Sequence, residues 1–99
     1  VAPCNYFKRE FQIPVTASEL KTVKVKIRID GTWGTYLPRV SLSGQGMTLS
    51  QDTKNSTTGS FEELTVSGTP TTTGIALLTI EAHSPNTDAA FYIDTITIE

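Results

Sequence analysis

Hydrophobic and polar residues alternate with a period of two along most of this chain, which is typical of β-strands that bury one face. The clearest stretch covers residues 23–30, where aliphatic side chains alternate with charged ones: Val23, Val25, Ile27 and Ile29 against Lys24, Lys26, Arg28 and Asp30. A shift of this strand by one residue would bury the charged row, so its register is strongly specified. Similar stretches predict further strands at residues 7–15, 39–43, 47–49, 61–66, 75–82 and 89–98.

Two of these stretches depart from simple alternation. Residues 75–82 form an almost continuous apolar run, which predicts a buried strand. In residues 89–98 the apolar side chains change parity halfway along: Phe91 and Ile93 against Ile96 and Ile98. A β-bulge at Asp94-Thr95 would bring all four side chains to the same face.

The segments between the predicted strands carry turn signals. Gly31 and Gly34 bracket one loop, and Gly44-Gln45-Gly46 forms another. Residues 50–60 contain no large apolar side chain, so we expect an exposed loop there. No segment shows the apolar stripe of an amphipathic helix. The pattern therefore predicts an all-β fold, an antiparallel β-sandwich of jelly-roll type with about seven to eight strands.

Composition agrees with this fold class. The chain has 99 residues, which is about the usual size of one domain, and 37% of them are hydrophobic. Threonine, whose branched side chain suits a half-exposed strand, makes up roughly one residue in six. We therefore expect residues 1–99 to form a single β-sandwich domain. Because the chain begins at Val1, we expect that domain to be a segment of a larger polypeptide.

Charge is divided unevenly along the chain, although the net charge is only −2. Residues 1–39 carry seven basic and three acidic residues, and residues 40–99 carry one basic and seven acidic residues. One basic row on a single strand face is a candidate partner surface: Lys24, Lys26 and Arg28. The alternative is an ordinary solvated face whose lysines discourage edge-to-edge aggregation. Aromatic residues are not interleaved with these bases, so we expect no nucleic-acid partner.

The residues that could support catalysis do not form a working set. The single cysteine, Cys4, excludes an internal disulfide and a cysteine-cluster zinc site. A pair of Cys4 with His83, the single histidine, would lack an identified third group to orient it. Glu62 and Glu63 are neighbours on a strand and therefore point to opposite faces. We expect a protein that is not an enzyme, and no stretch is long and apolar enough for a membrane span.

A sugar site needs flat aromatic platforms with polar groups beside them. The segment around the Gly31–Gly34 loop offers four candidate glycan-binding residues: Trp33, Tyr36, Arg39 and Asp30. The alternative is structural, with Trp33 capping one end of the core and Tyr36 packing along a strand.

Three pieces of the second half, residues 59–66, 74–80 and 91–96, resemble the C-terminal half of carbohydrate-binding-module-like jelly rolls, also called galactose-binding-like domains. The resemblance implies that Phe61 takes the place of a core tryptophan. In several such domains an acid near the last strand holds a structural Ca²⁺, which makes Asp94 a candidate metal ligand. Thr95 replaces the second acid of that pair, so the alternative is a bulge residue whose carboxylate is satisfied by backbone N–H groups. No other cofactor is expected.

Such domains occur in secreted glycoside hydrolases, in bacterial surface proteins, and in phage and virus structural proteins. The interpretation we favour is a non-catalytic structural or interaction module of a virion-surface or extracellular assembly, such as a decoration, fibre or tail domain, with weak glycan binding. Its partners would be other protein subunits or domains of that assembly. The alternative is a carbohydrate-binding module of a secreted glycoside hydrolase.

Overall fold

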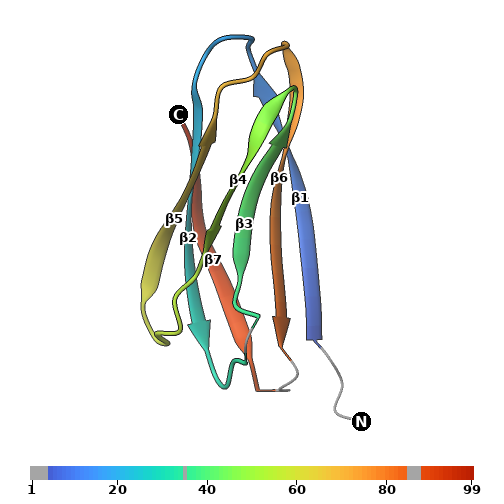
Figure 1. The fold of residues 1–99 in the computed structure, drawn as a ribbon. Helices are drawn as coiled ribbons and strands as arrows, with labels where there is room; N and C mark the ends of the chain where they lie inside the picture. Colours follow the sequence, from blue (N-terminus) through green and yellow to red (C-terminus); the bar gives the residue numbers. More distant parts are fainter. Residues whose placement is uncertain (1–4, 35, 85–87) are drawn as a thin grey trace.

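The computed structural model describes residues 5–34, 36–84 and 88–99, and these contain seven β-strands and no helix (Figure 1). In chain order the strands are β1 (Asn5–Val15), β2 (Lys21–Asp30), β3 (Arg39–Gly44), β4 (Met47–Thr53), β5 (Phe61–Gly68), β6 (Gly74–Ser84) and β7 (Ala90–Ile98).

The strands form two layers that face each other (Figure 1). One sheet has the order β1-β6-β3-β4 and the other has the order β5-β2-β7, and all pairings are antiparallel. Three pairs are nested like one long hairpin: β3 with β4, β2 with β5, and β1 with β6. The hairpin is folded over so that β3 also pairs with β6 and β2 with β7. The predicted antiparallel β-sandwich is thus confirmed.

The core lies between the two sheets and is built from the alternating positions that the sequence marks. All four aliphatic side chains of β2 are completely buried: Val23, Val25, Ile27 and Ile29. They pack against inward side chains of β3 and β6, such as Leu42 and Leu78. Full burial of one such side chain contributes about 1.5–3 kcal/mol relative to leaving it in water. The central strand β2 therefore holds its register through its apolar row.

The β-bulge predicted in the last strand is present. Val25 faces Ile96 across the β2–β7 pair, and Ile27 faces Ile93. A step of two residues along β2 thus matches a step of three along β7, which places the extra residue at Asp94-Thr95. The bulge returns the apolar residues of both halves of β7 to the core side.

The prediction of a fully buried strand at residues 75–82 is only half right. Ala76, Leu78 and Ile80 face the core, but Ile75 and Leu77 are exposed on the outer face. β6 is a central strand of a sheet whose other face is open to solvent, so its apolar run does not require burial on both sides.

Two other expectations need correction at the end of the sandwich beside β5. β4 continues through Thr53, and the side chain of Lys54 is 1% exposed, so residues 50–60 are not an exposed loop throughout. The Lys54 ammonium donates hydrogen bonds to Asn55 Oδ1 (2.9 Å) and to the Thr57 carbonyl (3.0 Å) and lies 3.4 Å from Glu62 Oε1. These contacts satisfy the buried ammonium group and hold the β4–β5 loop against the core.

Phe61 is 47% exposed, so the expectation that it takes the place of a core tryptophan is wrong.

Candidate functional site

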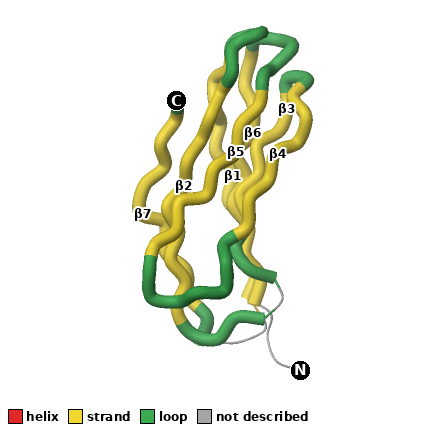
Figure 2. Tube along the Cα trace, turned by 60° about the vertical axis from the view of Figure 1, so that its left-hand side comes forward, coloured by secondary structure: helices red, strands yellow, loops and turns green. Residues whose placement is uncertain are grey.

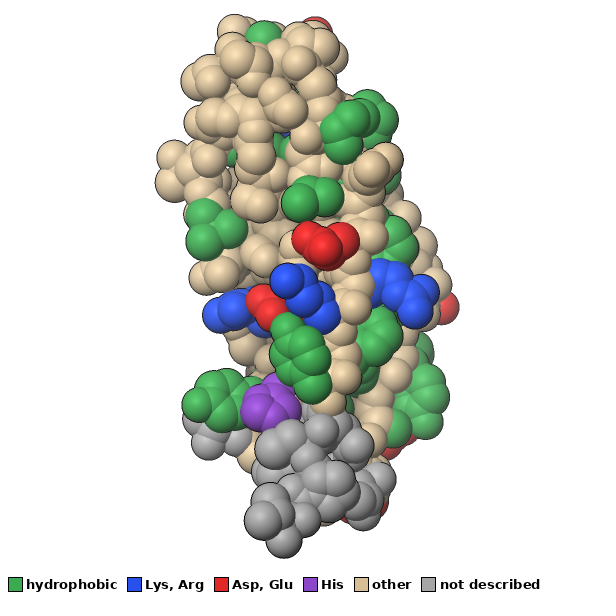
Figure 3. All heavy atoms as spheres, turned by 90° about the vertical axis from the view of Figure 1, so that its right-hand side faces the viewer, with side chains coloured by type: hydrophobic (Ala, Val, Ile, Leu, Met, Phe, Trp, Pro, Cys, Tyr) green, Lys and Arg blue, Asp and Glu red, His purple; other side chains and the backbone are tan. Residues whose placement is uncertain are grey.

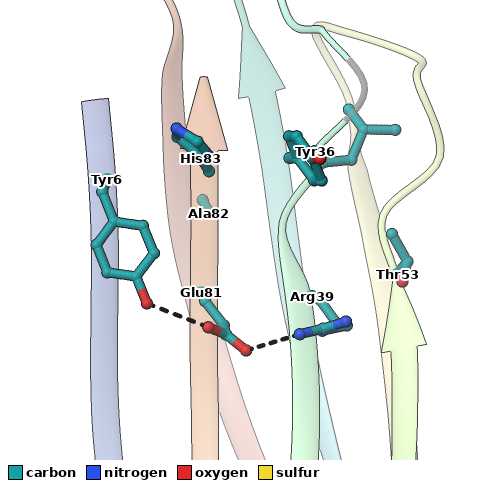
Figure 4. A pocket seen from close by; sticks show the side chains of 8 residues that line it. Tyr6, Tyr36, Arg39, Thr53, Glu81, Ala82 and His83 are labelled. Carbon is teal, nitrogen blue, oxygen red and sulfur yellow. Dashed lines mark hydrogen bonds and ion pairs between the residues drawn. The ribbon is translucent and has the colours of Figure 1, made fainter. Parts of the chain in front are cut away.

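A groove lies on the outer face of the four-stranded sheet, near the end where β6 finishes and β3 begins (Figure 4). Its volume is about 370 Å³, and its walls come from β1, β6, β3, the end of β4 and the segment before β3. The lining residues are Tyr6, Tyr36, Leu37, Arg39, Thr53, Glu81, Ala82 and His83. Figure 3 shows this side of the molecule, with charged side chains in a band and with apolar side chains and the histidine beside them.

A carboxylate between two donors forms the floor of the groove. Arg39 Nη2 donates a hydrogen bond to Glu81 Oε1 (2.9 Å), and Tyr6 Oη donates one to Glu81 Oε2 (3.3 Å), as Figure 4 shows. Arg39 and Glu81 are direct partners across the β3–β6 pair, and Tyr6 is opposite His83 in the β1–β6 pair. Side chains that share an outer face at such positions lie close together. The sheet register therefore assembles the network.

The same contacts change the ionisation of the carboxyl group. The hydrogen bond from Arg39 is the main reason that the pKa of Glu81 lies below its ordinary value of 4.5. Partial burial acts in the opposite direction, and the hydrogen bond from Tyr6 and the positive charges of Arg39 and Lys8 lower the pKa further. Glu81 is consequently ionised at neutral pH and acts as a hydrogen-bond acceptor.

Aromatic side chains form the walls on either side of this floor. Tyr36 stacks on the imidazole ring of His83, with centroids 5.4 Å apart and planes at 19°, and Tyr6 meets the same ring edge-on at 6.0 Å. The two tyrosines remain 63% and 62% exposed, respectively. The groove thus combines apolar ring surface with one cation and one anion in a small space.

The structure brings two of the four predicted glycan-binding residues into the groove, Tyr36 and Arg39. The other two lie elsewhere. Trp33 is half-buried against the core, and its Nε1–H donates a hydrogen bond to the Asp30 carbonyl (3.0 Å). Its ring packs edge-to-face with that of Phe91, with the ring centroids 6.3 Å apart. The Asp30 carboxylate pairs with Arg28 on the other sheet. Trp33 therefore occupies the position of a core cap, the structural alternative that its sequence context left open.

Tyr6, Thr53, Glu81 and His83 were not assigned to a binding site from the sequence, although His83 was considered for catalysis. Tyr6, Glu81 and His83 come from two strands that are more than seventy residues apart in the chain. Their outward parity is visible in the sequence, but the pairing of β1 with β6 is not. No local motif connects Tyr6 to Glu81, so only the register of the two strands reveals their proximity.

The predicted basic partner surface lies on the outer face of the three-stranded sheet, where acids of the same chain accompany it. Lys24 is 3.3 Å from Glu99, and Arg28 is 2.6 Å from Asp30. The hydrogen bond from Arg28 is the main reason that the pKa of Asp30 is lowered, and the same contact raises the pKa of Arg28. Lys26 stands opposite an acid too, Glu63 on β5. Part of the charge asymmetry between the two halves of the chain is thus neutralised within the fold.

The candidate metal ligand Asp94 lies exposed in the bulge of β7 and accepts a hydrogen bond from Thr95 Oγ1 (3.0 Å). Among the described residues, no group of three or more His, Cys, Asp or Glu side chains could hold a metal ion. The described part of the chain also contains no helix that is long and apolar enough to cross a membrane. Cys4, considered above with His83, lies outside the described residues.

Comparison with known proteins gives no match: no family model, no curated protein and no solved structure matches this chain.

Proposed function

We propose that this chain is a non-catalytic binding module of an extracellular or virion-surface assembly, and that its groove holds a short saccharide. The observation that carries the proposal is the pair of exposed tyrosines, Tyr6 and Tyr36, on either side of the Arg39–Glu81 pair. The jelly-roll resemblance of the second half of the chain supports the setting. The proposal requires no cofactor.

The chemistry of the groove suits a sugar. The C–H faces of a pyranose ring stack on flat aromatic surfaces through apolar contacts, and these contacts need no charged group. The guanidinium of Arg39 donates hydrogen bonds and the carboxylate of Glu81 accepts them, so neighbouring hydroxyl groups find both kinds of partner. The Arg39–Glu81 pair has no net charge, so the groove favours neutral sugars over strongly anionic ones.

The size of the groove limits the ligand and its affinity. A volume of about 370 Å³ lies at the lower end of small-molecule sites, which span about 300–1,000 Å³. The groove is open to solvent on the outside of a sheet, so a bound saccharide keeps part of its surface in water. We therefore expect weak binding of a short saccharide, one that becomes effective when several copies act together.

A glycan array followed by calorimetric titration of the strongest ligand tests the proposal. Tyr36→Ala and Tyr6→Ala should each weaken binding at least about tenfold, since each removes a stacking surface worth about 1.4 kcal/mol or more. The matched control is Tyr92→Ala, which removes a tyrosine that is 48% exposed on the opposite sheet. Equal affinity of all three variants and the wild type, or no binding across the array, would contradict the proposal.

A further inference from the structure

The nested strand pairs leave the last strand without a partner on one side. β3 pairs with β4, β2 with β5, and β1 with β6, whereas β7 pairs with β2 alone among the described residues. β7 is consequently the edge of the three-stranded sheet, and Figure 2 shows it at the left with no strand beyond it. The opposite sheet has four strands, so one layer of the sandwich is narrower than the other.

The core-facing row of β7 shows the effect of this free edge. The inward side chains of its neighbour β2 are all completely buried. None of the inward side chains of β7 is buried to that degree, and Ile98 is 48% exposed. The members of this row are Phe91, Ile93, Ile96 and Ile98. A further strand beside β7 would cover them.

The same opening exposes the edge strand of the opposite sheet. Phe7 and Phe11 of β1 are only partly buried, and Phe7 meets Phe91 of β7 edge-on at 4.8 Å. Arg9 lies between them at a core-facing position, opposite the buried Ile80, and yet it is exposed. Its guanidinium lies 5.5 Å from the centre of the Phe7 ring and has no ion-pair partner among the described residues. A cation therefore stands at the rim of an uncovered apolar surface.

We propose that the outer edge of β7 is a docking site for an extended strand of a neighbouring protein, which pairs antiparallel with β7 and completes a four-on-four sandwich. Strand addition of this kind takes its affinity from backbone hydrogen bonds and its specificity from alternate side chains. Every strand pair in both sheets is antiparallel, and the incoming strand follows the same arrangement. The incoming strand carries apolar residues at alternate positions, and these cover the core-facing row of β7.

Charge complementarity specifies one further feature of the partner. β1 and β7 run in the same direction (Figure 1), and Phe7 contacts Phe91, so Arg9 stands near the level of Ile93. A carboxylate in the core-facing row of the incoming strand at that level would pair with Arg9. A second copy of this chain that paired through its own β7 offers only apolar side chains in that row. The surface therefore fits a strand with one acid among alternating apolar residues better than it fits a copy of itself.

The proposed strand can be attached covalently to the end of β7, which presents it to the edge at high effective concentration and so tests the site. An Asn-Gly turn added after Glu99, followed by about seven residues, forms a hairpin whose second strand lies antiparallel to β7. In the in-phase extension Val and one Glu occupy the core-facing positions and Thr the others. In the matched control the Val and Thr positions are exchanged. The in-phase extension should raise the unfolding midpoint by about 5 °C or more and should protect the amides of β7 from hydrogen exchange, and the control should do neither. Equal behaviour of the two extensions would overturn the proposal.

Two measurements on the unextended chain settle what occupies the edge. A synthetic peptide with the in-phase sequence should shift the amide resonances of β7 in the unextended protein, and should leave those of the in-phase extended protein unchanged because its edge is filled. Light scattering should show a monomer from about 5 µM to about 500 µM, the range in which a small protein interface would reveal itself. A dimer that the in-phase extension abolishes would identify a second copy as the occupant and overturn the proposed partner.

Discussion

The two outer faces of the sandwich use the same kinds of residue to different ends. On the four-stranded sheet Arg39 pairs with Glu81 between Tyr6 and Tyr36, and on the three-stranded sheet Arg28 pairs with Asp30 beside Tyr92. The first arrangement borders the groove, and its two rings are more than 60% exposed. In the second, the Arg28 guanidinium lies 5.2 Å from the centre of the Tyr92 ring and covers its face. Tyr36 also stacks on a side chain of the protein, His83, but it remains 63% exposed and lines the groove, so the first arrangement differs in that its rings border a cavity.

The largest expected effect is a loss of stability on substitution of Trp33, the residue that caps the core and lies outside the groove. Trp33→Ala removes a half-buried ring and its hydrogen bond to the Asp30 carbonyl, so the free energy of unfolding should fall by about 2 kcal/mol. Saccharide affinity of the folded protein should not change, because Trp33 does not line the groove. Denaturant unfolding and calorimetric titration measure the two quantities. A loss of affinity at full stability would move the binding surface to the Trp33 end of the core.

A smaller effect distinguishes the two arginine–carboxylate pairs. Glu81→Gln keeps the shape of the side chain but removes the anionic acceptor, and saccharide affinity should fall about tenfold. Asp30→Asn makes the same change on the opposite face and serves as the control, for which affinity should remain at the wild-type value. Titration calorimetry of both variants provides the measurement. If the two substitutions change saccharide affinity equally, the groove face and the opposite face do not differ in the way proposed.

Acidification should weaken saccharide binding in the groove. The pKa of Glu81 is lower in the folded protein than its ordinary value of 4.5, mainly because Arg39 hydrogen-bonds its carboxylate. The stabilisation from this group is therefore fully present above pH 4.5 and is lost as pH falls through the folded pKa. Saccharide affinity should therefore decline as pH falls below that ordinary value. In Glu81→Gln this decline should be absent, and its persistence would assign the titration to another group.

The smallest effect concerns the arginine on the three-stranded sheet. Arg28→Ala uncovers the ring of Tyr92, which is not among the residues that line the groove. Saccharide affinity should therefore change by less than about twofold, since exposed charge pairs contribute little. Binding gained in this variant would show that an open ring face alone is sufficient, and that the groove is not the decisive difference.

Alternation in the sequence predicted the inward rows of the strands, because a period of two reports directly which side chains share a face. The bulge at Asp94-Thr95 was predictable for the same reason. The groove was only partly predictable: Tyr36 and Arg39 stand in one local segment, but Tyr6 and Glu81 meet only through the pairing of distant strands. Burial of Lys54 was not predictable either, since it depends on carbonyl groups that the folded loop supplies.

The most direct test of the central claim is a map of amide chemical shifts during titration with the best saccharide from the array. The account predicts that the resonances that move belong to the groove, at Tyr6, Tyr36, Arg39 and His83, and that those of Arg28 and Tyr92 stay in place. Shifts confined to the three-stranded sheet, with the groove silent, would contradict it.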